Sequence, residues 1–402
     1  MTWDLPSVRR ESRIEWPLWL AVAGLMLFGA AFIFSATGTT DGAARLPWWR
    51  FRVISQILAY GMGIGVVGAL CLVDYSRLAR WSLVGYWISI LLLVAVALFG
   101  VSRLGARRWL DFGMIQFQPS ELAKLTFLFA MANFLSRPIG ELASPALFAK
   151  ALGMTLLPFV LILKQPDLGS SLVFLPVALA MMFVAGVPHR FLVRFLGGGA
   201  LVVVIILVDV LYAPPGWNVV KLEEYQKQRL LVYFGLDFAP RNATPAERLA
   251  AKAEQETKSY NVRQALISVG SGGLVGKGWR EGTQSALGYL PRAVAHNDFI
   301  FSVIAEEKGF LGSLMVLILY GLVLFSGLRI AARARDRLGR LLAVGVVTLL
   351  FTHIFVNIGM NIRLVPVTGI PLPLLSAGGT SVVCSLIAIG ILQNIHLHRR
   401  HF

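Results

Sequence analysis

Residues 282–309 have the sequence GTQSALGYLPRAVAHNDFIFSVIAEEKG, which places acidic, amide and aromatic side chains where an apolar membrane segment begins. Asp298 is followed by three apolar residues, then by Glu306 and Glu307, and the uninterrupted apolar run starts near Leu311. Charged side chains are costly at membrane depth, so those that occur there usually mark a functional site. The stretch predicts a polar entrance to a transmembrane helix, with Asp298 either capping that helix or acting chemically.

The composition of the whole chain is that of a membrane protein. Of 402 residues, 56% are hydrophobic and 14% are charged, and the mean hydropathy is +0.71. A transmembrane helix needs about 20 apolar residues. Ten stretches reach or approach that length: 17–36, 53–73, 82–102, 119–135, 145–163, 171–186, 190–212, 298–328, 341–361 and 379–397. We therefore expect an all-α polytopic membrane protein in which residues 1–402 form one integral membrane domain.

The distribution of basic residues predicts the orientation of the chain. If the N-terminus is cytoplasmic, the inner loops and termini hold fifteen basic residues and the outer loops hold eight. Cytoplasmic loops carry the excess of positive charge in membrane proteins, so we expect both termini to be cytoplasmic. The long polar connection, residues 213–297, then lies on the extracytoplasmic side and should contain short helices.

The formal net charge of +16 raises the question of an anionic partner. The charges are scattered through short membrane loops and form no nucleic-acid-binding module, so we expect no nucleic acid partner. Membrane lipid headgroups account for the inner basic residues. An anionic lipid-linked substrate would account for the outer ones, which are Arg45, Arg50, Arg52, Arg103, Arg107, Arg108, Lys164 and Arg363.

Two segments of the outer connection carry local structural signals. Ala246–Tyr260 is rich in alanine and mixed in charge, and Thr244-Pro245 supplies a capping residue and a first-turn proline. This pattern predicts a solvent-facing helix. Residues 261–279, NVRQALISVGSGGLVGKGW, have short apolar runs broken by glycines, which indicates a re-entrant or interfacial hairpin.

The first polar cluster within the spans is GARRWLDFGMIQFQPSELAKL, residues 105–125. Its Arg-Arg-Trp triplet at 107–109 suits a membrane interface, where guanidinium and indole groups meet lipid headgroups. Glu121 and Lys124 are three residues apart and share one helical face. They either neutralise each other or contact a substrate.

Two further clusters follow. In KQPDLG, residues 164–169, Asp167 either caps the next helix or pairs with Lys124, since neither charge can stay alone in a low dielectric. Residues 357–381, NIGMNIRLVPVTGIPLPLLSAGGTS, contain three prolines and four glycines. This content predicts a break in the helix around Pro366 to Gly379, and broken membrane helices commonly line a cavity.

These clusters, in this order, resemble the SEDS (shape, elongation, division and sporulation) family of cell-wall polymerases. The matching stretches are GARRWLDFGMIQFQPSELAKL, KQPDLGSSL, YNVRQALISVGSGGLVGKGWREGTQSALGYLP, HNDFIFSVIAEEKGFLG and NIGMNIRLVPVTGIPLPLLSAGGTS, which together span residues 105 to 381. The KGWREGTQ segment favours the elongation branch of the family, RodA, over the division branch, FtsW.

The resemblance implies a peptidoglycan glycosyltransferase that polymerises lipid II during lateral elongation and maintenance of rod shape. It implies a location in the bacterial inner membrane with a periplasmic active site. The implied partners are lipid II, the nascent glycan strand, a class B penicillin-binding protein that supplies the transpeptidase, and other elongation-complex proteins. The family's essential aspartate maps onto Asp298 and its tryptophan onto Trp109. The candidate substrate-binding residues are Arg107, Arg108, Trp109, Gln118, Glu121, Lys124, Asp167, Lys277, Gln284 and Glu306.

The implied reaction can be compared with these residue types. Lipid II has an α-linked diphosphate leaving group and the product is β-1,4-linked, so the simplest route is one in-line displacement with inversion. Asp298 is the candidate base for the acceptor hydroxyl, and Arg107, Arg108 and Lys124 are candidates to stabilise the departing diphosphate. A divalent cation, Mg or Mn, is left open. Glu306 would lie roughly 12 Å further along a continuous helix, so it is expected to hold the loop and substrate path.

Four positions depart from the family pattern: Arg292 after Pro291, Asn297 in place of a common threonine, Arg363 in place of a usual glycine, and Ala377 in place of a frequent tyrosine. Two functions outside polymerisation also remain open. A lipid II flippase would use the outer basic residues and broken helices without a base at position 298. An ion-coupled transporter would use Asp167, Lys124 and Glu306 as a proton relay.

Overall fold

The computed structural model describes residues 13–43, 51–103, 106–111, 116–212, 224–239, 244–290 and 295–399. Within these residues, nine helices are long and apolar enough to cross a membrane. A tenth helix is shorter, at 17 residues. The ten expected spans correspond to α1 (Trp16–Ala43), α2 (Arg52–Cys71), α4 (Ser82–Phe99), α5 (Pro119–Leu135), α7 (Pro145–Leu163), α8 with α9 (Leu168–Leu172 and Phe174–Ala185), α10 (His189–Tyr212), α15 (Ile300–Ala332), α16 (Arg337–Asn361) and α17 (Gly379–Leu397).

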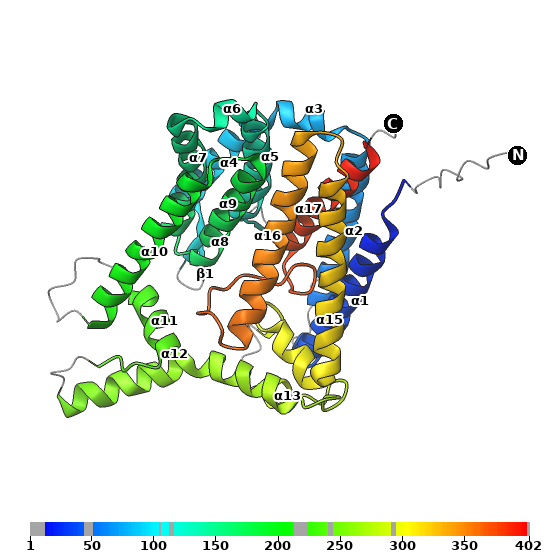
Figure 1. The fold of residues 1–402 in the computed structure, drawn as a ribbon. Coiled ribbons are helices and arrows are strands. Elements are labelled where there is room, and N and C mark those ends of the chain that lie inside the picture. The colour runs from blue at the N-terminus through cyan, green and yellow to red at the C-terminus, as the bar shows by residue number, and fades with distance from the viewer. Residues whose placement is uncertain are drawn as a thin grey trace, which may run out of the picture.

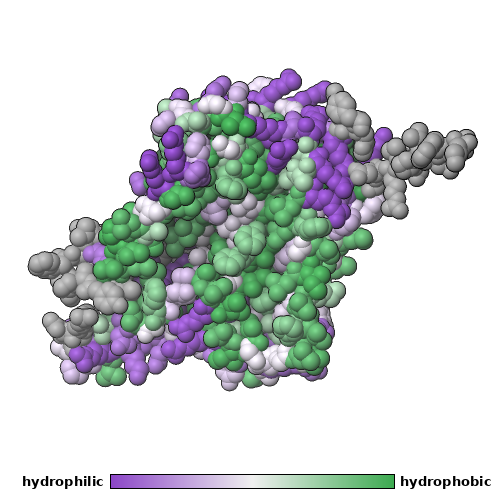
Figure 2. Space-filling model, in the orientation of Figure 1, coloured by the Kyte–Doolittle hydropathy of each residue, from purple (hydrophilic) through white to green (hydrophobic). Residues whose placement is uncertain are grey.

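The helices form a bundle with two polar ends. Helix α1 begins and helix α17 ends at the same end of the bundle, which also carries the short helices α3 (Tyr75–Arg80) and α6 (Ile139–Leu142) (Figure 1). The helices α11 (Glu224–Phe234), α12 (Pro245–Ser271) and α13 (Thr283–Ala286) lie at the opposite end. Figure 2 shows apolar surface over the long helices between these two ends. The arrangement agrees with a membrane-spanning bundle whose termini share one side.

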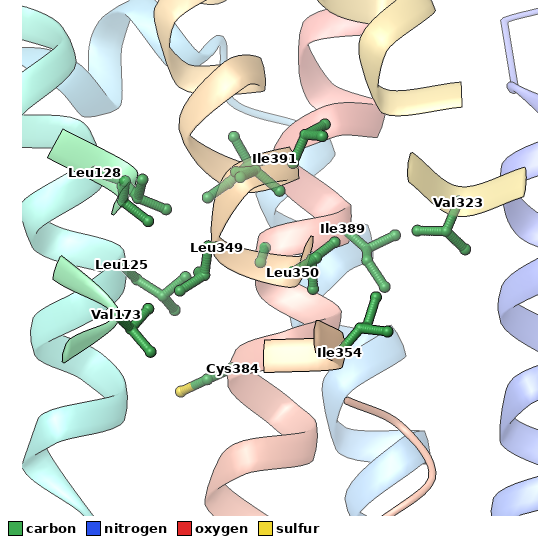
Figure 3. Packing of buried hydrophobic residues seen from close by; sticks show 14 of the residues in the cluster. Leu125, Leu128, Val173, Val323, Leu349, Leu350, Ile354, Cys384, Ile389 and Ile391 are labelled. Atoms are coloured by element: carbon green, nitrogen blue, oxygen red, sulfur yellow. The ribbon is translucent and has the colours of Figure 1, made fainter. Parts of the chain in front are cut away.

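Helix α16 and helix α17 form the centre of the bundle, whereas α10 is almost fully exposed at its edge. Apolar side chains from α5, α16 and α17 meet in the interior (Figure 3): Leu125, Leu128, Leu349, Leu350, Ile389 and Ile391. Helix α17 also packs closely on α2, where a Cβ at Gly390 would lie 2.7 Å from a methyl group of Val67. Small residues at such contacts let membrane helices approach and gain packing energy.

A small antiparallel sheet, which the sequence did not predict, follows α4. Its strands are β1 (Val101–Arg103), β2 (Ala106–Asp111) and β3 (Gln116–Phe117), in the order β1-β2-β3. Val101 pairs with Trp109, and Leu110 pairs with Phe117. Helix α4 therefore ends three residues before the predicted limit of its span. The residues that follow it form backbone hydrogen bonds in the sheet and not in the helix.

Helix α15 is interrupted at Gly309, whose backbone has φ 64° and ψ −157°. The segment 272–279 satisfies the hydrogen-bonding groups that this break exposes. The bonds run from Lys277 N to Glu306 O (3.0 Å), from Gly278 N to Glu307 O (3.1 Å), from Phe310 N to Gly273 O (2.8 Å) and from Leu311 N to Leu274 O (3.1 Å). The polar entrance predicted for this helix is thus a separate first segment, braced by the glycine-rich loop.

The predicted helix in the outer connection is confirmed, and it is longer than expected. Thr244 and Glu247 form a capping box at the start of α12. The hairpin predicted for residues 261–279 is wrong in its first half, because α12 continues to Ser271. Ala265 and Ser268 are buried, and α12 packs on α15 at this end. Packing of this face of α12 against α15 stabilises the helix, although the short apolar runs and glycines of this segment favoured a hairpin.

The predicted break between α16 and α17 is confirmed, since residues 362–378 are not helical. Polar side chains from neighbouring helices satisfy carbonyl groups of this segment. Tyr60 donates to Leu374 O at 2.5 Å, and Tyr320 donates to Pro373 O at 2.5 Å. Irregular backbone is tolerated inside a membrane protein where other protein groups cover and satisfy it in this way.

Candidate functional site

A cavity of about 340 Å³ lies at the end of the bundle that carries α11 and α12. Its walls come from these two helices, from the start of α15, and from the segment after α16. The described residues that line it are Gln228, Arg229, Val232, Tyr233, Lys258, Asn261, Val262, Asp298, Phe299, Arg363, Val365, Pro366 and Val367. Asp298 is the one carboxylate among these lining residues, and three of the others are basic.

The main chain at Asp298 is fixed by two amides from α16. Asn357 Nδ2 and Asn361 Nδ2 each donate to Asp298 O at 3.1 Å. The preceding carbonyl, Asn297 O, accepts a 2.6 Å bond from Ser376 Oγ. The residue that precedes α15 as its N-cap is Phe299, so the capping role considered for Asp298 is not what the structure shows. The carboxylate is left to face the cavity.

Burial raises the pKa of Asp298 from its ordinary value to about 6. Arg229 and Arg108 act against this shift, and the negative charge of Asp167 adds to it. A carboxylate with a pKa near 6 is mostly ionised at neutral pH, yet it is more basic than an exposed aspartate. Such a group is suited to accept a proton from a reacting hydroxyl.

Asp167 pairs with Arg108 and not with Lys124, so the predicted Asp167–Lys124 pair is wrong. Arg108 Nη1 lies 3.8 Å from Asp167 Oδ1, and the guanidinium also donates to Gln165 O and Pro166 O. Gln118 Nε2 lies 3.4 Å from Asp167 Oδ2. Asp167 Oδ1 accepts from Ser170 N at 3.1 Å, which confirms the predicted helix cap on α8.

Lys124 is neutralised by its own helical neighbour. Its Nζ lies 2.7 Å from Glu121 Oε1 and 3.1 Å from His353 Nε2 on α16. All three side chains are buried, beside a space of only about 10 Å³. The i, i+3 pairing predicted from spacing is confirmed. The group lies in the bundle interior and does not line the cavity of Asp298, so a substrate contact by Glu121 or Lys124 stays a prediction.

Lys277, Gln284 and Glu306 come together around the break in α15. Glu306 Oε1 accepts from Lys277 Nζ at 2.6 Å, from Gln284 N at 2.9 Å and from Thr283 Oγ1 at 3.1 Å. Glu307 Oε1 accepts from Ser35 Oγ at 2.5 Å. Glu306 holds the loop as expected and does not belong to the described cavity lining, so its part in the substrate path stays a prediction.

Two of the predicted residues can be placed only in part. Trp109 lies in β2, half-buried. Arg107 belongs to the same strand, but its side chain lies outside the described residues, as does Arg292. Ala377 donates its N–H to His296 O at 2.9 Å, which ties the segment after α16 to the residues preceding Asp298.

Sequence reasoning missed most of the basic wall of the cavity. Arg229 and Lys258 come from α11 and α12 and were not predicted, whereas Arg363 was among the outer basic residues expected to face an anionic substrate. No sequence motif of the outer connection marked Arg229 or Lys258 as residues of the site. Only their convergence on Asp298 in three dimensions identifies them.

Among the described residues, no group of three or more His, Cys, Asp or Glu side chains could hold a metal ion. The cavity instead combines one carboxylate with basic groups. A divalent cation at this site stays a prediction.

The model of the Cell cycle protein family, which groups FtsW, RodA and SpoVE, matches residues 15–401. Peptidoglycan glycosyltransferase MrdB of Escherichia coli (strain K12) is 36% identical over 383 residues, which cover 95% of this chain and 93% of that protein. Peptidoglycan glycosyltransferase RodA of Treponema pallidum (strain Nichols) is 30% identical over 442 residues, which cover 97% of this chain and 99% of that protein.

Solved structures show the same architecture. One of them is a chain of a peptidoglycan synthase complex, in a structure that describes the coordination of polymerization and crosslinking by that complex. It superposes on this protein with a TM-score of 0.75 at 29% identity, and the match covers 96% of this chain and 98% of that chain. The crystal structure of the rod shape-determining protein RodA of Thermus thermophilus has a TM-score of 0.65 at 30% identity and covers 97% of this chain and 98% of its own length.

Proposed function

The chain belongs to the FtsW/RodA/SpoVE family, and we propose from this premise that it polymerises lipid II into β-1,4-linked glycan with Asp298 as the general base. It is a peptidoglycan glycosyltransferase of the rod-shape elongation branch, as relatives named MrdB and RodA are. The substrate and the linkage are proposed from the family resemblance, and the role of Asp298 is proposed from its position in the cavity.

The observation that carries the proposal is the position of Asp298. It is the one carboxylate among the described residues that line the cavity, and its pKa is raised to about 6 by burial. Its main chain is held by Asn357 and Asn361. A fixed, ionised and moderately basic carboxylate can take the proton of an acceptor sugar hydroxyl as that oxygen attacks.

One base supports a single displacement with inversion. The acceptor oxygen forms a bond to the anomeric carbon of the donor, and the bond from that carbon to the diphosphate oxygen breaks on the opposite face. The proton passes to Asp298, and the bonding pair leaves with the lipid diphosphate. A retaining route needs a second carboxylate as nucleophile at the same carbon. Glu306 does not line the cavity and is occupied by Lys277, Thr283 and Gln284.

The basic side chains of the cavity suit the leaving group. Arg229, Lys258 and Arg363 share its lining with Asp298, and Arg108 is close enough to influence the Asp298 carboxylate. Negative charge builds up on the diphosphate as it departs, and positioned cations stabilise that charge most where water is partly excluded. Arg108, Arg229 and Lys258 are therefore our candidates for the diphosphate site, whereas the Arg363 guanidinium is bonded to the carbonyls of Val232 and Tyr233.

The chain is a multi-pass membrane protein, and its relatives support the bacterial inner membrane as its location. We place its termini in the cytoplasm and its cavity on the periplasmic side, because basic residues are more numerous at the end where both termini lie. The similar chain from a complex that coordinates polymerization with crosslinking supports a crosslinking partner for this protein. We propose that this partner is a class B penicillin-binding protein.

The decisive experiment compares Asp298→Asn with Asp237→Asn, the same chemical change at an exposed aspartate of the outer connection. Each purified protein receives labelled lipid II, with and without a candidate partner and with and without a metal chelator. We expect Asp298→Asn to abolish glycan synthesis and to keep lipid II binding, whereas Asp237→Asn polymerises normally. Synthesis by Asp298→Asn would remove the base assignment. Lipid II transport without polymer would favour the flippase.

A further inference from the structure

Arg363 occupies a backbone position that normally favours glycine. It follows Ile362, the C-cap residue of α16, and its φ is +59°. Leu364 N donates to Gly359 O at 2.7 Å, and Arg363 N donates to Met360 O at 3.3 Å. These two bonds form a Schellman motif, in which the residue with left-handed backbone is usually glycine. A side chain here is held in a conformation that L-residues rarely adopt.

The Arg363 side chain and Tyr233 form a reciprocal pair of contacts, which we name the 233/363 clasp. Arg363 Nη2 donates to Val232 O at 3.1 Å and to Tyr233 O at 3.4 Å. In return, the Tyr233 hydroxyl donates to Leu364 O at 2.9 Å. The accepting carbonyls lie in the last turn of α11, where the helix dipole favours a cation.

The clasp joins α11 to the transmembrane bundle. On its other side α11 is tied to α12, through Gln228 Nε2 to Glu254 Oε1 at 2.7 Å and through the carbonyl of Leu236, which accepts from Gln255 at 3.1 Å. Both bonds stay within the outer connection, residues 213–297. The clasp instead connects α11 to the end of α16, the helix whose amides hold the main chain of Asp298.

Arg229 lies on α11 about one helical turn before the residues that the clasp holds. Arg229 lines the cavity together with Asp298 and has the largest charge effect among the neighbours on its carboxylate. Arg363 lines this cavity and also a smaller space of about 40 Å³ behind it. The clasp thus fixes the position of α11, and its Arg363 side chain lies between the cavity of Asp298 and the smaller space.

We propose that Arg363 is a positioning residue for the glycosyl transfer: through the 233/363 clasp it holds α11 so that Arg229 faces Asp298 across the cavity. Loss of the clasp lets α11 move away, which weakens the basic wall that binds the anionic diphosphate of the donor. This inference rests on the proposed function. It differs from a purely structural role because it predicts effects on substrate affinity and on the pH profile of a folded protein.

The test compares Arg363→Gly, Arg363→Ala and Tyr233→Phe. Arg363→Gly removes the clasp and relieves the left-handed backbone, so we expect a melting temperature equal to or above that of the wild type. We expect its KM for lipid II to rise roughly 3- to 10-fold with kcat changed by less than about twofold. The acid limb of its rate profile should move to higher pH, because Arg229 then lowers the pKa of Asp298 less.

The other two variants separate the clasp from backbone strain. Arg363→Ala should lose affinity as Arg363→Gly does, but with a lower melting temperature, because its Cβ remains at a positive φ. Tyr233→Phe removes one bond without touching that backbone and should raise KM about twofold. If Arg363→Gly fails to fold, Tyr233→Phe carries the test.

Wild-type KM and an unmoved acid limb in every clasp variant that folds would overturn the proposal. That outcome is distinguishable from failure of the proposed function, in which the wild-type protein itself makes no glycan from lipid II.

Discussion

The most informative perturbation of this site is removal of the Arg229 charge, followed through the pH dependence of the rate. Asp298 works as a base only when ionised, and burial raises its pKa to about 6. Arg229 favours the ionised form and Asp167 opposes it. We therefore expect Arg229→Met to raise the pKa of Asp298 further. Asp167→Asn, which retains a capping side chain for α8, should lower it.

The size of the effect follows from the ionised fraction. With a pKa of about 6, roughly 9% of Asp298 is ionised at pH 5 and about 91% at pH 7, so the wild-type rate should fall about tenfold between them. An aspartate with an ordinary pKa would still be more than about 90% ionised at pH 5. At pH 6 the wild-type rate should be about half of its own plateau. If Arg229→Met raises the pKa of Asp298 by about one unit, the rate of that variant at pH 6 should be about a tenth of its own plateau.

The assay is the initial rate of polymerisation of labelled lipid II from pH 5 to 8.5, normalised to each variant's plateau. The melting temperature at each pH shows that the protein remains folded. A wild-type rate that is constant from pH 5 to 7 would refute the assignment of Asp298 as a base of raised pKa. An acid limb that stays in place in Arg229→Met, or moves to lower pH, would refute the charge coupling across the cavity.

Three further changes test the framework around the site. Lys124→Met should destabilise the protein by about 3–5 kcal/mol, because Glu121 is left buried without its partner; the double variant with Glu121→Gln should recover most of that loss in thermal denaturation. Gly309→Ala should cost about 3 kcal/mol or more, since its backbone is left-handed and a Cβ would lie 2.7 Å from Leu274 O; a melting temperature within a few degrees of the wild type would argue against this reading of the break. Asn361→Ala removes one donor to the Asp298 carbonyl and should lower kcat roughly tenfold with little change in KM, and an equal loss of binding would contradict the positioning role.

Some functional features were visible in local sequence because local chemistry determines them. The three prolines in residues 357–381 cannot continue a helix and the glycines there weaken one, so the break after α16 was predictable. Thr244 and Pro245 supply a capping residue and a first-turn proline, so the start of α12 was predictable too. Asp298 stood out because a carboxylate beside an apolar run needs a reason to be there. Spacing also favoured the Glu121–Lys124 pair, since residues three apart share a helical face.

The choice between competing partners was decided only by the tertiary structure. Asp167 had two plausible roles, and it pairs with Arg108 because β2 brings that guanidinium to the start of α8. Lys124 meets His353, which is 229 positions away in the chain. The small sheet and the extension of α12 were missed for a related reason: their stability comes from pairing and burial against distant segments, which a local pattern does not contain.

The sequence by itself determined that this protein is a helical membrane bundle and that its chain breaks between α16 and α17, and it singled out Asp298 as a charged residue at the start of a membrane span. These properties follow from hydrophobic length, backbone chemistry and the cost of charge in an apolar medium, all of which act over a few neighbouring residues. Only the tertiary structure decided that Arg229, Lys258 and Arg363 join Asp298 around one cavity. Their convergence depends on how α11, α12 and the end of α16 pack together, and electrostatic interactions act through that spatial proximity and not along the chain.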